Sequence, residues 1–411
     1  MKFDQYNISD GLKSNIAKLG YKKPTDIQFK SIPAILKGED VLAIAQTGTG
    51  KTAAFVIPIL DILENRKIKG RADGIKCLVM APTHELALQL EAVFKQLAKY
   101  SKITIFAIHG GVDQDPQIKQ LEKGVDVLIA TPGRLFDLVS QDVLRLTRVE
   151  ILVLDEADHM LDLGFIKDIR DLLKYLPKKR QTLFFSATIN EEIKKLAYSL
   201  VTRAIRIQVS PKNPVAKNID HAVAYIEMDD KRFFLENLIK NNAINKMLVF
   251  VRTKVRAERV KKALSRVGIE ADTIHSDKTQ DERDSAMRDF RKGEIIILIA
   301  TDISARGIDI PNVEYVVNYD IPDKAENYVH RVGRTGRGTS KGNAISFCSS
   351  EEKAFLEAIE SILMEPIDTI EITKTDYIHT KSSTTKNEED WQSLMKSAQN
   401  TIKKSGKKKR R

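Results

Sequence analysis

The 411-residue sequence has little cysteine and no long apolar run. Its two cysteines, Cys77 and Cys348, each lie inside an apolar stretch, and their spacing fits no metal site. We therefore expect buried, reduced thiols and a reducing, cytoplasmic compartment. The opening residues MKFDQYNISDG lack the apolar core of a secretory signal, and no uncharged apolar stretch approaches membrane-spanning length. The sequence therefore predicts a soluble protein with no membrane partner.

Positive charge is in excess, with a formal net charge of +11, but it is unevenly distributed. Seven of these charges fall in residues 403–411, which leaves +4 for the rest of the chain. A polar stretch at 378–390, rich in Ser, Thr, Lys and Asn, precedes them. This composition predicts a disordered basic tail and a polyanionic partner. The terminal KKKRR also matches a nuclear import signal, which leaves a second compartment open.

Apolar residues make up 42% of the chain, enough for two hydrophobic cores at this length. Short β-branched runs alternate with amphipathic stretches, the pattern of a parallel sheet covered on both faces by helices. The segment VSPKNPVAKN, with two prolines and no periodicity, separates two series of such runs. We predict two doubly wound α/β domains at 1–209 and 218–370, a linker at 210–217, and a polar, basic tail at 371–411.

A glycine-rich segment, AQTGTGKT at 45–52, follows the apolar run VLAIA and precedes a helical pattern. This is the context of a phosphate-binding loop, in which backbone N–H groups and the helix dipole hold phosphate. We expect Lys51 to contact the β and γ phosphates of ATP and Thr52 to hold Mg²⁺. An ordinary glycine-rich turn is the alternative, but this pattern arises by chance in only about 3% of chains of this length.

Acidic residues follow the apolar run ILVL at Asp155, Glu156 and Asp158. A carboxylate at the end of a buried strand beside a phosphate-binding loop can hold magnesium, and its neighbour can orient or deprotonate the attacking water. A solvated acidic cluster is the alternative, but it would not need four apolar residues leading into it. A further segment, YVHRVGRTGR at 328–337, places arginine at every third position among glycines, which suits either a basic surface loop or an anion site.

In this order, the motifs resemble the DEAD-box family of RNA-dependent ATPases over nearly the whole chain up to residue 370. The other matching segments are GYKKPTDIQ at 20–28, APTHELA at 81–87, the glycine pair 110–111, TPGR at 131–134, SAT at 186–188, LVFVRT at 248–253, HSDKTQDER at 275–283 and ATDISARGIDI at 300–310. The resemblance implies two tandem RecA-like domains, ATP and Mg²⁺ as cofactors, and RNA as partner. Among members of the family, the chain looks most like the bacterial RhlE type.

The resemblance also implies an ATP site and a catalytic set. Phe3 would stack on the adenine and Gln28 would bind its edge, whereas Arg334 and Arg337 would act as arginine fingers at the γ-phosphate. The implied ATP-binding residues are Phe3, Tyr21, Gln28, Ala45, Gln46, Thr47, Gly48, Thr49, Gly50, Lys51, Thr52, Gly307 and Asp309, with Mg²⁺ held through water by Thr52 and Asp155. The implied catalytic residues are Lys51, Asp155, Glu156, His330, Arg334 and Arg337. Coupling between the domains is assigned to Asp158, Ser186 and Thr188.

An RNA site over both domains is implied in the same way. Its residues are Pro82, Thr83, His84, Gly111, Thr131, Arg134, Arg252, Thr253, Asp277 and Thr301. Backbone amides and hydroxyls directed at phosphates and 2′-hydroxyls would favour RNA without reading its sequence. Two residues depart from the family pattern, because His84 stands where arginine is usual and Ser276 where glycine is usual. Three other histidines, His109, His159 and His221, are expected to be surface or satisfied core residues.

The sequence thus predicts a monomeric ATP-dependent RNA helicase that binds single-stranded RNA across two domains and locally unwinds short duplexes. One alternative is an ATP-gated RNA clamp that remodels or anchors complexes, which would hydrolyse ATP without unwinding. The other is a DNA-directed translocase built on the same paired domains. The adenine-reading segment GYKKPTDIQ and the sequence DEAD at 155–158 argue against it.

Overall fold

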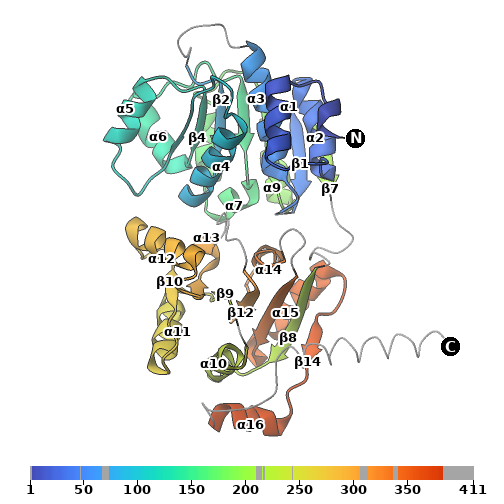
Figure 1. Ribbon diagram of the computed structural model, residues 1–411, viewed down its shortest axis with the longest axis vertical. Helices are drawn as coiled ribbons and strands as arrows, with labels where there is room; N and C mark the ends of the chain where they lie inside the picture. The colour runs from blue at the N-terminus through green and yellow to red at the C-terminus, as the bar shows by residue number, and fades with distance from the viewer. Residues whose placement is uncertain are drawn as a thin grey trace, which may run out of the picture. The chain divides into compact units, whose positions relative to one another are not determined.

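The computed structural model describes residues 2–46, 48–66, 74–209, 215, 218–242, 244–305, 313–336 and 341–382. The chain divides into two compact units, and the boundary between Pro211 and Lys212 falls inside the expected linker. Each unit contains one seven-stranded sheet with helices against it (Figure 1). In the described residues, no helix has both the length and the apolar character needed to cross a membrane. The predicted fold class, two tandem α/β domains with parallel sheets, is confirmed.

The first sheet has the strand order β3-β4-β2-β5-β6-β1-β7, and its pairings are parallel. Its strands are β1 (Val41–Ala45), β2 (Cys77–Met80), β3 (Ile105–Ile108), β4 (Val127–Ala130), β5 (Ile151–Leu154), β6 (Gln181–Ser186) and β7 (Ile205–Val209). Its helices are η1 (Phe3–Gln5), α1 (Asp10–Lys18), α2 (Asp26–Leu36), α3 (Lys51–Arg66), α4 (His84–Leu97), α5 (Asp115–Glu122), α6 (Pro132–Ser140), α7 (Ala157–Asp162), α8 (Ile166–Leu172) and α9 (Glu191–Leu200).

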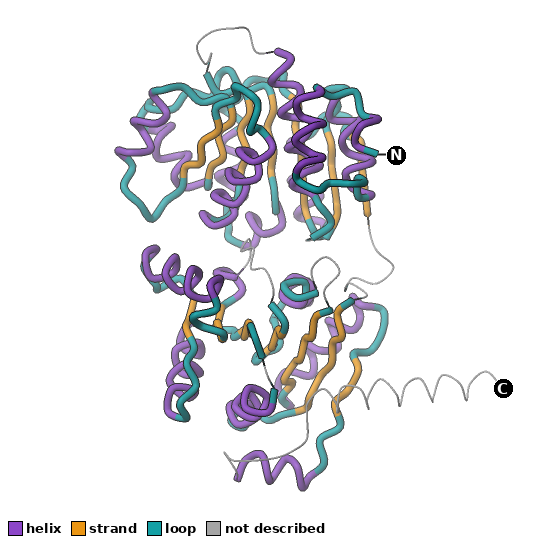
Figure 2. Tube along the Cα trace, viewed as in Figure 1, coloured by secondary structure: helices purple, strands orange, loops and turns teal. Residues whose placement is uncertain are grey.

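Alternate residues of the first sheet belong to two separate cores. Val41 and Ala43 pack with residues of α1 to α4, whereas Leu42 packs with residues of α6 to α9 on the other face. Figure 2 shows strands and helices alternating along this unit. Because both faces of the sheet are buried at β1, β2, β4 and β5, these strands are continuously apolar, which is why the sequence shows runs there rather than an alternating pattern.

The second sheet, β10-β11-β9-β12-β13-β8-β14, repeats the topology of the first, because β8 to β14 occupy the places of β1 to β7 in the same order. Its pairings are also parallel. The strands are β8 (Ile219–Tyr225), β9 (Met247–Phe250), β10 (Asp272–Ile274), β11 (Ile297–Ala300), β12 (Tyr315–Asn318), β13 (Gly342–Cys348) and β14 (Asp368–Ile370). The helices are α10 (Lys231–Asn241), α11 (Lys254–Arg266), α12 (Gln280–Lys292), α13 (Asp302–Ala305), α14 (Ala325–Val332), η2 (Ser350–Glu352), α15 (Lys353–Leu363) and α16 (Lys374–Ser382).

The ordered part of the second unit extends beyond the predicted boundary at residue 370. The sequence predicts a disordered tail from residue 371, but Lys374–Ser382 forms α16. Tyr377 attaches this helix to α10, because its hydroxyl donates to Asp230 Oδ2 at 2.9 Å and accepts the N–H of Glu227 at 3.1 Å. Its ring also packs against Phe234, with ring centroids 5.0 Å apart. The prediction was wrong for this helix because its composition is polar and its anchors are tertiary. Residues 383–411 lie outside the described part.

Replacing Tyr377 by Phe is expected to loosen α16 while keeping the ring contact. The loss of the hydroxyl leaves the partly buried Asp230 carboxylate without this donor, a change that typically costs about 1–3 kcal/mol. Hydrogen exchange of the full chain should therefore accelerate in 374–382. The matched control is Tyr198→Phe, which alters an exposed tyrosine of the first unit. Unchanged exchange in α16 would contradict the anchoring role of the hydroxyl.

Candidate functional site

The predicted site residues of the first unit share one edge of its sheet, because the carboxyl ends of parallel strands open on the same side. The phosphate-binding loop follows β1, the acidic residues follow β5, and Ser186 ends β6. These three strands are neighbours in the sheet. The segments expected to bind RNA follow β2, β3 and β4, which are also neighbours. Strand order alone therefore divides the edge into two parts: a nucleotide half, defined by the segments predicted to bind nucleotide, and an RNA half, defined by those predicted to bind RNA.

The loop between β1 and α3 has the backbone geometry of an anion-binding turn. Gly48 and Gly50 have φ of 79° and 90°, values that residues other than glycine rarely adopt. Lys51 is the first residue of α3, and its buried Nζ donates to the carbonyl of Ala45 at 2.7 Å. Thr49 Oγ1 donates to the carbonyl of Gln46 at 2.7 Å. The remaining loop residue in the prediction, Thr47, lies outside the described residues.

Gln28 joins the adenine-reading segment to the phosphate-binding loop. Its side chain is only 3% exposed. The amide Oε1 accepts the N–H of Thr25 at 3.0 Å, which completes a capping box at the start of α2, and Nε2 donates to the carbonyl of Gly50 at 3.1 Å. A Cβ added at Gly50 would lie 2.5 Å from that nitrogen. The close approach of the two segments therefore requires glycine at this position.

The two aromatic residues expected near the adenine are in contact with each other. Phe3 is buried, and its ring meets that of Tyr21 edge-on, with centroids 6.0 Å apart and planes at 87°. This places η1 against the segment that precedes α2. The structure thus brings together Phe3, Tyr21, Gln28 and the phosphate-binding loop, from three separate stretches of sequence.

The acidic residues after β5 occupy a strained and buried turn. Burial raises the pKa of Asp155 to about 7; the charge of Lys51 opposes this shift, and those of Glu156 and Asp158 add to it. Asp155 Oδ1 accepts the N–H of Glu156 at 3.1 Å. Glu156 itself has φ 50° and ψ 50° and precedes α7. A left-handed conformation at a residue other than glycine costs about 1–3 kcal/mol and occurs mainly at functional sites.

Asp158 connects the acidic turn to the segment after β6. Its Oδ2 accepts three hydrogen bonds, from the N–H of Ala187 at 3.1 Å and from the N–H and Oγ1 of Thr188, both at 3.0 Å. Ser186 Oγ donates to the carbonyl of Thr188 at 2.8 Å. The residues assigned to coupling, Asp158, Ser186 and Thr188, therefore form one hydrogen-bonded unit within the first domain.

The RNA half of this edge is built from helix starts and one buried arginine. Thr83 caps α4 by accepting the N–H of Leu86 at 3.3 Å. His84 is buried, and its ring lies 4.3 Å from that of His109, centroid to centroid. Arg134, 8% exposed, donates through Nη2 to the carbonyl of Val112 at 2.7 Å, whereas its Nε and Nη1 have no hydrogen-bond partner among the described residues.

Sequence reasoning did not anticipate the ring contact of His109 with His84. The signal was its place directly before the glycine pair 110–111, which brings it to the same edge as His84. The prediction of a satisfied histidine fits both His109, whose Nδ1 lies 3.0 Å from the carbonyl of Gly110, and His221, whose Nδ1 lies 2.9 Å from the hydroxyl of Tyr328.

In the second unit, the segments expected to bind RNA follow β9, β10 and β11, again three neighbouring strands. Thr253 caps α11 by accepting the N–H of Arg256 at 3.2 Å, and Asp277 pairs with Lys254 at 2.7 Å. Arg252 pairs with Glu352 at 3.0 Å and with Asp323 at 2.8 Å. Its guanidinium is thus held by two carboxylates of its own domain, and its predicted RNA contact stays a prediction.

The arginines of segment 328–337 differ in environment. Arg331 is 1% exposed and donates to both carboxylate oxygens of Asp302, at 2.5 and 2.8 Å, and to the carbonyl of Asp320 at 2.7 Å. Its anion is therefore a carboxylate of the same domain. His330 and Arg334 are also buried. Arg337, Gly307 and Asp309 lie outside the described residues.

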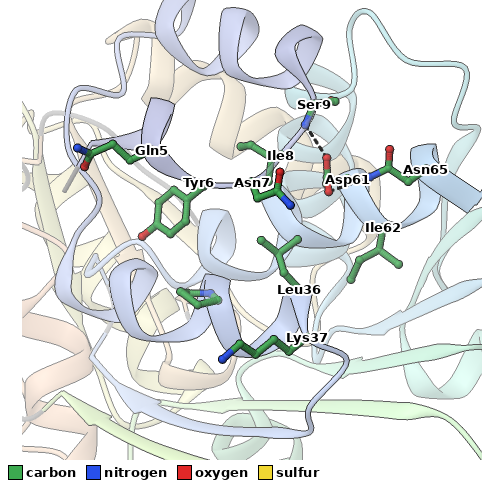
Figure 3. Close-up of a pocket in the computed structure, with 11 residues that line it drawn as sticks. Gln5, Tyr6, Asn7, Ile8, Ser9, Leu36, Lys37, Asp61, Ile62 and Asn65 are labelled. Carbon is green, nitrogen blue, oxygen red and sulfur yellow. Dashed lines mark hydrogen bonds between the residues drawn. The ribbon is translucent and has the colours of Figure 1, made fainter.

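A hollow of about 750 Å³ lies between the N-terminal segment, α2 and α3 (Figure 3). On its wall, the N–H of Ser9 donates to Asp61 Oδ1 at 2.7 Å (Figure 3), and burial raises the pKa of Asp61. Its lining includes Leu36 and Asn65, far along α2 and α3 from Gln28 and Lys51, and none of the predicted site residues. It is therefore distinct from the phosphate-binding loop.

Among the described residues, no group of three or more His, Cys, Asp or Glu side chains could hold a metal ion.

A phosphate-binding loop beside a strand-end carboxylate, on the first of two parallel-sheet domains, defines a P-loop nucleoside triphosphatase. The family model described as DEAD/DEAH box helicase matches residues 25–196, and the helicase conserved C-terminal domain matches residues 230–339. The chain belongs to the DEAD-box family of ATP-dependent RNA helicases.

Similar proteins agree with this assignment. The DEAD-box ATP-dependent RNA helicase CshA of Bacillus cereus is 39% identical over 376 residues, covering 91% of this chain and 70% of the relative. CshA of Bacillus subtilis is 39% identical over 368 residues, covering 89% and 73%. The solved structure of S. cerevisiae Dbp5 bound to RNA and ADP BeF3 has a TM-score of 0.84 and 31% identity, covering 97% of this chain and 99% of that one. The predicted likeness to the RhlE type is not confirmed by these relatives.

Proposed function

We propose that this protein is an RNA-stimulated ATPase that binds single-stranded RNA and locally unwinds short duplexes. The observation that carries the proposal is the division of one sheet edge into a nucleotide half over β1, β6 and β5 and an RNA half over β2, β4 and β3. The relatives named CshA are RNA helicases, and the similar Dbp5 structure holds RNA and ADP BeF3. Because both halves lie on one sheet, a conformational change at the nucleotide half would alter the conformation of the RNA half.

The nucleotide half suits phosphate chemistry. Lys51 and the backbone N–H groups of its loop would hold the β and γ phosphates. The oxygen donors of Thr52 and Asp155 fit Mg²⁺, which prefers carboxylate and hydroxyl or water ligands. When bound, the ion would neutralise phosphate charge. Glu156 would orient the attacking water and accept its proton, because its carboxylate is fixed next to that of Asp155.

Arg334 and Arg337 are proposed to stabilise charge on the γ-phosphate, with His330 linking to the acidic turn. Such contacts would form in the transition state and contribute little to ground-state binding of ATP. The unit of Asp158, Ser186 and Thr188 would transmit the state of the acidic turn, because one carboxylate oxygen holds the segment after β6.

The RNA half suits a phosphate backbone rather than particular bases. Helix starts such as those at Thr83 and Thr131 direct backbone N–H groups outward, and Arg134 has unpaired donors in the described part of the chain. In the second domain, Thr253, Asp277 and Thr301 are proposed to continue the path. The expectations of a monomer and of a cytoplasmic location stay predictions.

Hydrolysis is expected to be stimulated by RNA far more than by DNA of the same sequence. Lys51→Ala should abolish turnover, because the phosphate-binding loop loses its cation, whereas Arg334→Ala should lower turnover much more than ATP affinity. Steady-state ATPase assays and ATP titrations of the three proteins measure both quantities. Equal stimulation by DNA would favour a translocase, and stimulation without duplex unwinding would favour an RNA clamp.

His84→Arg is expected to tighten RNA binding. It adds a permanent charge that can stack on His109, as guanidinium groups do on flat rings. If this charge meets one phosphate, the slope of log K against log salt should steepen by about 0.7. Filter binding across a salt series measures the slope, and Tyr198→Arg, which adds the same charge at an exposed residue of α9, is the control. Identical slopes in the two variants would contradict a phosphate contact at residue 84.

The basic residues 403–411 are proposed to tether RNA that flanks the two domains. If four or five of their charges engage at once, ending the chain at residue 396 should make the salt slope shallower by roughly 3. ATP hydrolysis at saturating RNA should persist, because the ATP motifs precede residue 340. Parallel salt plots of the full and shortened chains would show that the tail contributes nothing to RNA binding.

A further inference from the structure

His159 is a buried histidine whose ring has no ordinary explanation as a core residue. It follows the acidic turn in α7, and its side chain is 2% exposed. Neither Nδ1 nor Nε2 has a hydrogen-bond partner among the described residues. The sequence suggested a surface or satisfied core histidine, and the structure corrects this, because the ring is buried but not satisfied. Since an unsatisfied buried polar group costs about 1–3 kcal/mol, a compensating role is expected.

The ring of His159 lies close to the carboxylate of Glu156. His159 Nδ1 lies 3.5 Å from Glu156 Oε2, a few tenths of an ångström beyond an ordinary hydrogen bond. Glu156 directly precedes α7 and His159 is the third residue of that helix, so the two side chains come from one short turn of the chain. A small rotation of either side chain would complete the bond.

The backbone around both residues is held in place. The N–H of His159 donates to Asp158 Oδ1 at 3.1 Å, while Asp158 Oδ2 is bound by the segment after β6. Glu156 has its left-handed backbone conformation immediately before the helix. The backbone of His159 therefore has a fixed position, so rotation of the side chains alone can bring its ring and the carboxylate of Glu156 together.

We propose that His159 is a positioning residue for Glu156, whose carboxylate it orients by donating the Nδ1 hydrogen to Oε2. With Oε2 held by the imidazole, Oε1 is directed at the attacking water. The side chain of Glu156 is then already oriented and does not have to lose rotational freedom at each turnover. A neutral imidazole donor also makes a charge-assisted bond to the carboxylate, stronger than a neutral pair. This inference rests on the proposed role of Glu156 in hydrolysis. In this role His159 would act through Glu156 and would touch neither nucleotide nor water.

Two isosteric variants test which nitrogen matters. In His159→Asn, the amide nitrogen occupies about the place of Nδ1, whereas in His159→Gln it occupies about that of Nε2. The hydrogen-bond role predicts near-parent kcat for the Asn variant and a loss of about 10- to 100-fold for the Gln and Ala variants, since misplacing a reacting group by about 1 Å can cost 100-fold. The affinities for ATP and RNA should be unchanged in all three. Equal rates for Asn and Gln, or a parent rate for Ala, would overturn the proposal.

A second arm separates positioning from a structural effect. In a Glu156→Gln background, His159→Ala should lower the residual hydrolysis no further, because two residues that act through one interaction are not additive. A full further loss would mean that His159 acts elsewhere. Failure of the proposed function would look different, since the parent protein would then show no RNA-stimulated turnover.

The hydrogen bond can also be observed without turnover. In protein labelled with ¹⁵N-histidine, the His159 ring is assigned by its disappearance in the His159→Gln variant. Its Nδ1 should be the protonated nitrogen, because the bond to a carboxylate selects that tautomer. The Glu156→Gln substitution should weaken the bond and shift this signal. A ring protonated on Nε2 alone would overturn the proposal, whatever the ATPase rates show.

Discussion

The parallel pairing of every recorded strand in each sheet is the constraint on which the rest of the site depends. It brings the carboxyl end of each strand to one edge, so residues distant in sequence become neighbours there. Lys51 and Asp155, for example, are close enough for the lysine charge to affect the pKa of the carboxyl. Because strand order is fixed by the buried registers, the order of the functional segments along the edge is fixed as well.

The two domains share this topology but differ in the residues that follow corresponding strands. Strand β8 takes the place of β1, but it ends at Tyr225 without the glycine loop that follows β1. Asp320 follows β12 as Asp155 follows β5, yet Asp320 pairs with Arg256 at 3.0 Å and accepts the N–H of Arg252 at 2.9 Å. The carboxylate at this strand end is thus neutralised by arginine in the second domain, which leaves phosphate chemistry to the first.

Much of this could be predicted from the sequence, because the information is local. Apolar runs separated by amphipathic stretches indicate buried parallel strands, and the glycine loop carries its own strand and helix context. Three features depend instead on tertiary contacts. The order of α16 comes from the anchors of Tyr377 on α10, the partner of Arg331 is Asp302 from another strand end, and His84 meets His109 across the sheet edge. Spacing within one segment cannot reveal a partner that lies in another.

The buried polar groups of the sheet edges divide into two kinds. Gln28, Asp158 and Arg331 are satisfied within their own domains, so their hydrogen bonds hold segments together and cost nothing further during turnover. Arg134 and His159 keep unpaired nitrogens within the described residues, and both lie at the carboxyl edge of the first sheet. A folded chain tolerates such a penalty where a partner arrives later, and the partners proposed here are phosphate for the arginine and a reoriented carboxylate for the histidine. The satisfied groups therefore hold the segments of each domain together, and the unpaired nitrogens of Arg134 and His159 lie where the proposals above assign each a partner.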